Sequence, residues 1–201
     1  MPVFPTFICL PFRTFFLRAT ASRYLHTLAL GAFVAWLAAW HGAALPQGLP
    51  GTDAKTRSVT QTVLGIVGYS RWPGDPQPVR LCVVGPTEYA DELLQGTEPP
   101  HSRRIEVRRL RLDDATLATS CDGIYAGRLD DDEWRRLAER IGPQAVLSIG
   151  ERRELCRIGC MFCLDVRPEG VGFESNPEAV ARSGVRVNPR VLQLSRRKAG
   201  P

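Results

Sequence analysis

The sequence lacks the short motifs from which common nucleotide-binding and hydrolytic sites are built. Residues 81–84 read as a buried strand, but only Gly85 follows, and not the G-x-G-x-x-G pattern of a dinucleotide site. Neither a Walker loop nor a G-x-S-x-G elbow occurs in the 201 residues. Dinucleotide, P-loop and serine-hydrolase chemistry therefore have no support, and we expect no cofactor and no catalytic residues.

Acidic residues are missing from residues 1–44, which carry three arginines. An apolar run at 28–40 follows the arginines, and Gly42 and Ala44 then supply the small residues of a cleavage site. The run has about 13 residues, whereas a membrane-spanning helix needs about 20. We therefore expect residues 1–44 to be a secretory signal peptide that is cleaved near Ala44, delivering the rest of the chain to an oxidising compartment.

Histidine and net charge are both scarce once that segment is set aside. His101 is the single remaining histidine, and the ligand-pair spacings of a zinc site are missing, so we expect no metal. Removing three arginines lowers the formal net charge from +5 to +2. The basic isoelectric point of the full chain is thus weak evidence for nucleic-acid binding, and we expect none.

The order of apolar and polar segments predicts an α/β fold. Residues 45–55 read as a flexible lead-in, 56–198 as a single domain and 199–201 as a tail. A helix beginning at Thr56 has one apolar face and ends before Trp72-Pro73. Strands at 81–84, 105–112, 124–126 and 145–149 alternate with helices at 87–94 and from Asp130 to Ile141. This alternation favours a mostly parallel open sheet flanked by helices.

The C-terminal part follows a different pattern. Residues 161–166 and 171–173 flank a turn and predict a late β-hairpin. Asn176-Pro177 and Asn188-Pro189 each place an N-cap before a proline, which predicts two C-terminal helices. In the strand at 105–112 the apolar phase shifts between Val107 and Leu110, which predicts a bulge or a bent edge.

Five cysteines lie outside the signal segment. Cys156, Cys160 and Cys163 have the spacing of an iron–sulfur ligand set, but an oxidising compartment and a small domain disfavour a cluster. Cys160 and Cys163 also form the C-x-x-C of a thiol–disulfide exchanger, although they run into an extended apolar segment. Structural disulfides are favoured: Cys82 with Cys121, and Cys156 with either Cys160 or Cys163.

Arginines form two candidate anion-binding groups. Arg103, Arg104, Arg108, Arg109 and Arg111 make a basic stripe, which we interpret as an edge strand protected by charge rather than as a site for an acidic partner. Arg71 and Arg186 each precede a rigid proline-containing element. They are candidates for binding a small anion or nucleotide.

Seven segments form an ordered set along the chain: residues 62–66, 69–73, 81–90, 121–122, 161–164, 171–173 and 179–187. Together they resemble the YfiR family, the periplasmic repressors of the membrane diguanylate cyclase YfiN. The similarity extends from about Val59 to Arg196. Two departures stand within it: Asn176-Pro177 replaces the Asn-Leu that is frequent in the family, and Asn188 stands where histidine is more usual.

The resemblance implies a non-enzymatic regulator that holds the periplasmic part of a YfiN-like cyclase inactive. A YfiB-like outer-membrane lipoprotein would sequester this repressor, raising cyclic-di-GMP and biofilm formation, and a redox change would also release it. The family bridges correspond to Cys82–Cys121 and Cys156–Cys163, which leaves Cys160 as a free thiol. The resemblance also implies a homodimer.

Overall fold

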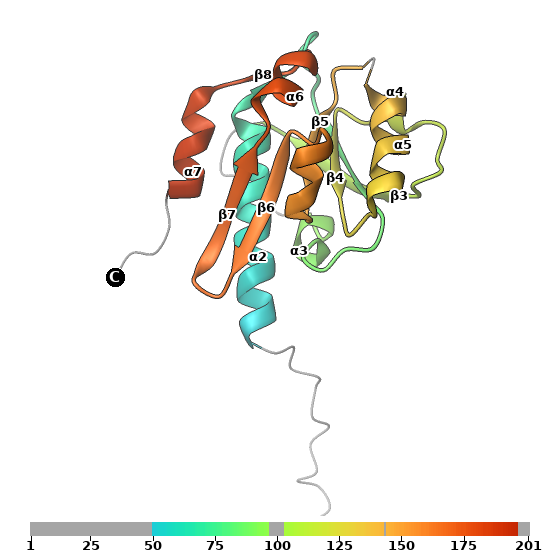
Figure 1. Ribbon diagram of the computed structural model, residues 1–201. Coiled ribbons are helices and arrows are strands. Elements are labelled where there is room, and N and C mark those ends of the chain that lie inside the picture. Colours follow the sequence, from blue (N-terminus) through green and yellow to red (C-terminus); the bar gives the residue numbers. More distant parts are fainter. Residues whose placement is uncertain (1–49, 97–102, 143, 197–201) are drawn as a thin grey trace, which may run out of the picture. The chain divides into compact units, whose positions relative to one another are not determined.

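Six strands form the central sheet of the computed structural model, which describes residues 50–96, 103–142 and 144–196 (Figure 1). The sheet order is β3-β2-β4-β5-β6-β7. The expected signal peptide, His101 and the expected tail at 199–201 lie outside the described residues.

The first five strands of this sheet run parallel to their neighbours, and the last is antiparallel. The chain enters the sheet at β2, places β3 on one side and continues with β4 on the other, so β2 lies at the point where the strand order reverses. The strands are β2 (Val79–Val84), β3 (Ile105–Leu110), β4 (Gly123–Ala126), β5 (Leu147–Gly150), β6 (Phe162–Arg167) and β7 (Gly170–Ser175). The predicted α/β class, mostly parallel sheet and late hairpin are confirmed.

Helices cover both faces of the sheet, because the side chains of each strand point alternately to opposite sides. In β2, Leu81 and Val83 belong to the apolar cluster that contains α2, whereas Cys82 and Val84 belong to the cluster that contains α5. The first layer holds α2 (Pro50–Gly68), α3 (Asp91–Leu94), α6 (Pro177–Arg182) and α7 (Leu192–Arg196). The second holds α4 (Leu117–Ser120), α5 (Asp131–Ile141) and the 3₁₀ helix η1 (Arg153–Ile158).

Helix α2 begins at Pro50, six residues before the Thr56 that the apolar spacing indicates. Its first turns lack an apolar face, so periodicity does not reveal them, and proline is well tolerated at the first helical position. The predicted apolar face is confirmed, since four of its residues are fully buried: Val59, Val63, Ile66 and Val67.

Side-chain caps set the starts of three later helices. Asp130 accepts a hydrogen bond from the Glu133 backbone, and the Glu133 side chain accepts one from the Asp130 backbone, which completes a capping box at α5. Asn176 caps α6 as predicted. Asn188 also acts as a cap, but it opens the 3₁₀ helix η2 (Pro189–Val191), which leads into α7.

Two local predictions are wrong. The helix expected from Thr87 begins only at Asp91, because residues 85–90 form bends and irregular backbone instead. The bulge, one of the two alternatives expected for the strand at 105–112, is wrong, since β3 pairs with β2 in unbroken register from Ile105 to Leu110, whereas the other alternative, a bent edge, stays a prediction. The apolar phase shifts because Val107 packs in the α2 layer and Leu110 in the α5 layer.

Candidate functional site

The five cysteines of the described residues all belong to the apolar cluster on the α5 side of the sheet. The sulfurs of Cys82 and Cys121 lie 2.03 Å apart, and those of Cys156 and Cys163 lie 2.17 Å apart; the Cα–Cα distance is 5.8 Å in both pairs. Cys160 is a buried free thiol. Across the part of the chain that the structure describes, no group of three or more His, Cys, Asp or Glu side chains is arranged to hold a metal ion.

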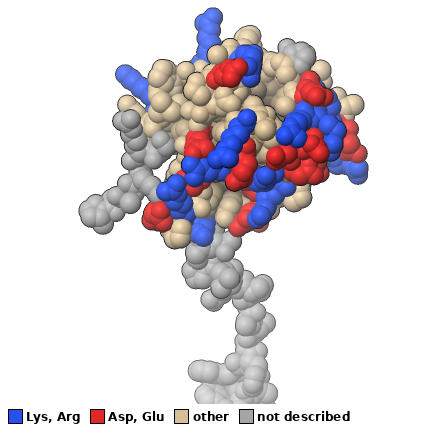
Figure 2. All heavy atoms as spheres, viewed as in Figure 1, with Lys and Arg blue, Asp and Glu red and all other residues tan. Residues whose placement is uncertain are grey.

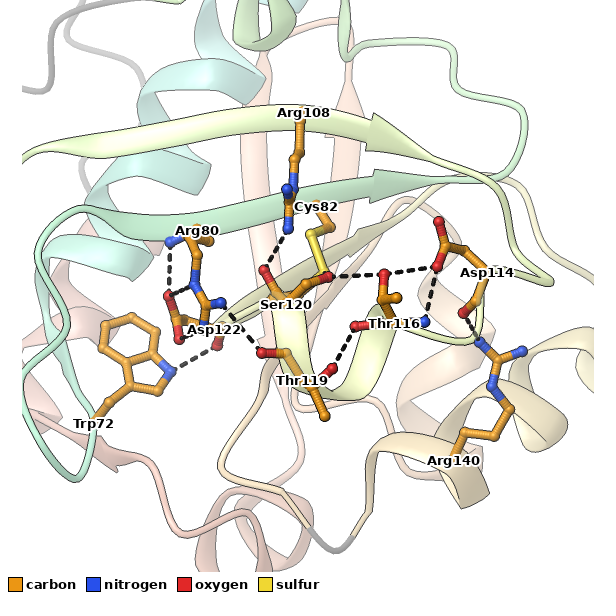
Figure 3. Close-up of a disulfide and its surroundings, with 11 residues drawn as sticks. Trp72, Arg80, Cys82, Arg108, Asp114, Thr116, Thr119, Ser120, Asp122 and Arg140 are labelled. Atoms are coloured by element: carbon orange, nitrogen blue, oxygen red, sulfur yellow. Dashed lines mark hydrogen bonds and ion pairs between the residues drawn. A yellow bond between two sulfur atoms is a disulfide. The ribbon is translucent and has the colours of Figure 1, made fainter.

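An ion pair next to the Cys82–Cys121 disulfide fixes the start of β4 (Figure 3). Asp122 accepts hydrogen bonds from the Arg80 backbone at 2.8 Å and from the Arg80 guanidinium at 2.8 and 3.0 Å. The hydrogen bond to Asp122 raises the pKa of Arg80 above its ordinary value. Asp122, the residue after Cys121, is therefore held by a charge-assisted contact in addition to the neighbouring disulfide.

Two further side chains hold the same segment through its backbone carbonyls (Figure 3). The indole N–H of Trp72 donates to the Asp122 carbonyl at 2.6 Å, and Arg108 donates to the Ser120 carbonyl at 2.6 Å. Trp72 follows α2 and Arg108 lies on β3, so the contacts reach the segment from two different elements. Noncovalent bonds thus hold residues 120–122 independently of the disulfide.

The Cys156–Cys163 disulfide connects η1 to β6 across a short loop. Helix η1 ends at Ile158 and is capped by Gly159, whose φ of +99° lies in the left-handed region that favours glycine. The side-chain amide of Asn176 donates to the Cys156 carbonyl at 2.8 Å while its oxygen caps α6. This asparagine therefore links the second bridge to the start of a C-terminal helix.

The Cys160 thiol lies inside that loop but is not bonded to Cys163. It is fully buried, contacts the Phe162 carbonyl at 3.2 Å, and its pKa is raised to about 12 by desolvation. Exchange enzymes need an accessible thiol with a lowered pKa. The geometry therefore disfavours the thiol–disulfide exchange interpretation.

We predict that mild reductant opens Cys156–Cys163 before Cys82–Cys121. Cys156 is 7% exposed, whereas Cys82 is 0% and Cys121 3% exposed, and the short loop also contributes less stability. Thiol labelling followed by peptide mapping measures the order. Cys160 should stay unlabelled at pH 8 until the protein is unfolded, because its raised pKa keeps it protonated. Equal resistance of the two bridges, or earlier loss of Cys82–Cys121, would contradict the prediction.

The structure brings Arg71 and Arg186 together. Strand β1 (Ser70–Arg71) pairs antiparallel with β8 (Arg186–Val187), and the two arginines are direct partners across this small sheet. Both are exposed. The Arg71 guanidinium donates to the carbonyls of Gly68 at 2.8 Å and Ser70 at 2.7 Å, which holds this group against the C-terminal end of α2.

The basic stripe lies on and around β3, which is an edge strand of the six-stranded sheet. Four of its arginines bind neighbouring groups of the same chain: Arg103 binds Asp75, Arg108 the Ser120 carbonyl, Arg109 Gly85 and Thr87, and Arg111 Asp113. Basic and acidic side chains are interspersed on the face seen in Figure 2. These contacts agree with an edge strand protected by charge.

A family model described as YfiR/HmsC-like matches residues 56–196, well over half of the chain. The match covers the whole central sheet, both disulfides and the paired arginines. Within the described residues, none of the helices is both long and apolar enough to cross a membrane. Proteins of this family are periplasmic regulators that act in signalling systems with partners, rather than enzymes. The chain belongs to the YfiR/HmsC-like family.

Proposed function

We propose that this protein is a periplasmic repressor that binds the periplasmic part of a YfiN-like membrane diguanylate cyclase and holds it inactive. The family match over residues 56–196 is the observation that carries the proposal. Repression lowers cyclic-di-GMP and biofilm formation, and a YfiB-like outer-membrane lipoprotein relieves it by sequestering the repressor. Residues 1–44 direct export and are cleaved near Ala44, and the mature protein acts as a homodimer.

One thermodynamic argument and one structural feature support a regulator with redox-sensitive disulfides. Inhibition needs no chemistry, only tighter binding to the inactive conformation of the cyclase than to the active one. The Cys156–Cys163 bridge connects η1 with the hairpin strand β6, and Asn176 continues that connection to α6. Opening the bridge would therefore alter the surface around these elements and change the affinity for a partner.

Deletion of the gene tests the proposal in the cell. Cyclic-di-GMP should rise in the deletion strain, and the rise should vanish when the partner cyclase is also absent. Purification of the tagged protein from the periplasm and membrane should recover the cyclase, and N-terminal sequencing should begin just after Ala44. An unchanged cyclic-di-GMP level together with no recovered cyclase would refute it.

A second candidate function is sensing of a small anion or nucleotide by Arg71 and Arg186. Like charges directly opposite on paired strands destabilise each other, and an anion bound between them removes that repulsion. Guanidinium groups also match the oxygens of a phosphate, and the strand pairing places both arginines at one position of the small sheet.

We predict that inorganic phosphate stabilises the protein against thermal unfolding, by about 2.7 kcal/mol at 100 times its dissociation constant. Arg71→Ala and Arg186→Ala should each weaken phosphate binding about tenfold, since each removes a charge-assisted bond. At the same phosphate concentration the stabilisation should then fall to about 1.4 kcal/mol. Arg136→Ala removes an exposed arginine of α5 and is the matched control. Phosphate stabilisation that persists in the Arg71/Arg186 double variant would exclude this site.

A further inference from the structure

The crevice that open α/β sheets usually leave for a ligand is closed in this protein. Such ligands bind beyond the carboxyl ends of the strands, where the strand order reverses, which here is the edge above β2 and β4. The Gly127 backbone donates to the Val84 carbonyl at 2.9 Å, and the Arg128 backbone donates to the Pro86 carbonyl at 2.6 Å. The loops after β2 and β4 are therefore bonded directly to each other.

Glycine makes this closure possible. A Cβ on Gly127 would overlap the carbonyl oxygen of Pro86 and lie 2.8 Å from both its carbonyl carbon and the Thr87 methyl group. The two loops can approach this closely only because position 127 has no side chain.

Beside the closed loops, a carboxylate of the chain occupies a cluster of hydrogen-bond donors. Glu151 follows β5 directly, and its side chain accepts from the backbone N–H of Glu88 at 3.0 Å and of Tyr89 at 3.0 Å. The hydroxyl of Tyr125 donates to it at 2.8 Å. Consecutive backbone N–H groups that converge in this way form a concave site for anions.

The third donor is fixed in place before any anion arrives. Tyr125 is a fully buried residue of β4, and desolvation raises the pKa of its hydroxyl above the ordinary value, so it remains a donor. The Glu151 backbone N–H donates to the Ala126 carbonyl at 2.8 Å, which aligns the carboxylate with these donors.

We propose that this cluster of donors is a carboxylate-binding site that Glu151 occupies as an intramolecular ligand, so that a small carboxylate binds there only when the Glu151 side chain is absent. The site is separate from Arg71 and Arg186, which lie on the β1–β8 pair, and it does not depend on the regulatory function proposed above. Its ligand class follows from the donors: three groups directed at one carboxylate, with one oxygen accepting from Tyr125 and from Tyr89.

Acetate is the probe, because Glu151→Ala removes a group of the same size and charge. Urea unfolding of the mature protein is followed in sodium acetate and in sodium chloride of equal ionic strength. Acetate should raise the urea midpoint of Glu151→Ala saturably and leave that of the wild type unchanged. Adding Tyr125→Phe to Glu151→Ala should weaken acetate binding about tenfold, because one bond to a charged group is lost.

Glu88→Ala is the matched control. Its exposed carboxylate lies beside the same donors but, among the described residues, accepts from the side chains of Tyr89 and Arg128 and from no backbone N–H, so its removal should create no acetate site. If Glu151→Ala is unfolded in chloride, acetate should restore its folding. The proposal is overturned if acetate stabilises Glu151→Ala no more than chloride does, or no more than it stabilises Glu88→Ala.

Discussion

Replacing Cys82 and Cys121 together by alanine is expected to lower the free energy of unfolding by about 4 kcal/mol. The two residues are 39 positions apart, and a cross-link that closes a loop of about 40 residues removes this much chain entropy from the unfolded state. Urea unfolding without reductant measures the loss. Near-native circular dichroism should persist at low urea, because Arg80, Trp72 and Arg108 still hold residues 120–122.

The other bridge supplies the comparison. Cys156 and Cys163 are seven positions apart, so their joint replacement by alanine should cost about 2.5 kcal/mol by the same entropy argument. A larger loss for this pair than for Cys82 and Cys121 would show that loop length does not set the stabilisation.

Gly127→Ala is expected to destabilise the protein by about 3 kcal/mol, which is the upper part of the range for overpacked sites. The added methyl group has no space against Pro86 and Thr87, so the loops after β2 and β4 must separate. Separation weakens the bonds from Gly127 to Val84 and from Arg128 to Pro86. Thermal and urea unfolding of the purified variant measure the effect.

Gly172→Ala in β7 is the matched control. A Cβ at Gly172 meets nothing within 4 Å and its φ is not in the left-handed region, so the substitution should be neutral or slightly stabilising. Equal stability of the two variants would mean that the loops above β2 and β4 move apart without cost.

Long-range pairing explains most of what the sequence did not predict. The apolar face of α2 and the Asn176 cap depend on residues three or four positions apart, so they were predictable. Strands β1 and β8 have two residues each and are separated by most of the domain, so no periodicity reveals their register. Arg71 and Arg186 could be named as candidates, but their placement opposite each other could not be predicted.

The loop between Cys156 and Cys163 and the donors around Glu151 also could not be predicted from the sequence. The spacing of Cys156, Cys160 and Cys163 is compatible with two partners for Cys156, because no residue pattern indicates the 3₁₀ helix η1 and the left-handed Gly159 that follows it. The role of Glu151 depends on the backbone N–H groups of Glu88 and Tyr89. Residue types do not indicate where backbone donors converge, so the sequence could not predict this contact.

The alternation of side chains along β2 determines which layer of the domain holds Cys82, and therefore what an insertion in this strand would do. Cys82 and the other four cysteines of the described residues belong to the α5 cluster. Within that part of the chain, the layer formed by α2, α6 and α7 therefore contains no thiol that can form or exchange a cross-link. A one-residue insertion within β2 would turn Cys82 to the opposite layer, away from Cys121, and leave both as free thiols. The pleat of β2 thus places Cys82 in the layer that holds the other four cysteines.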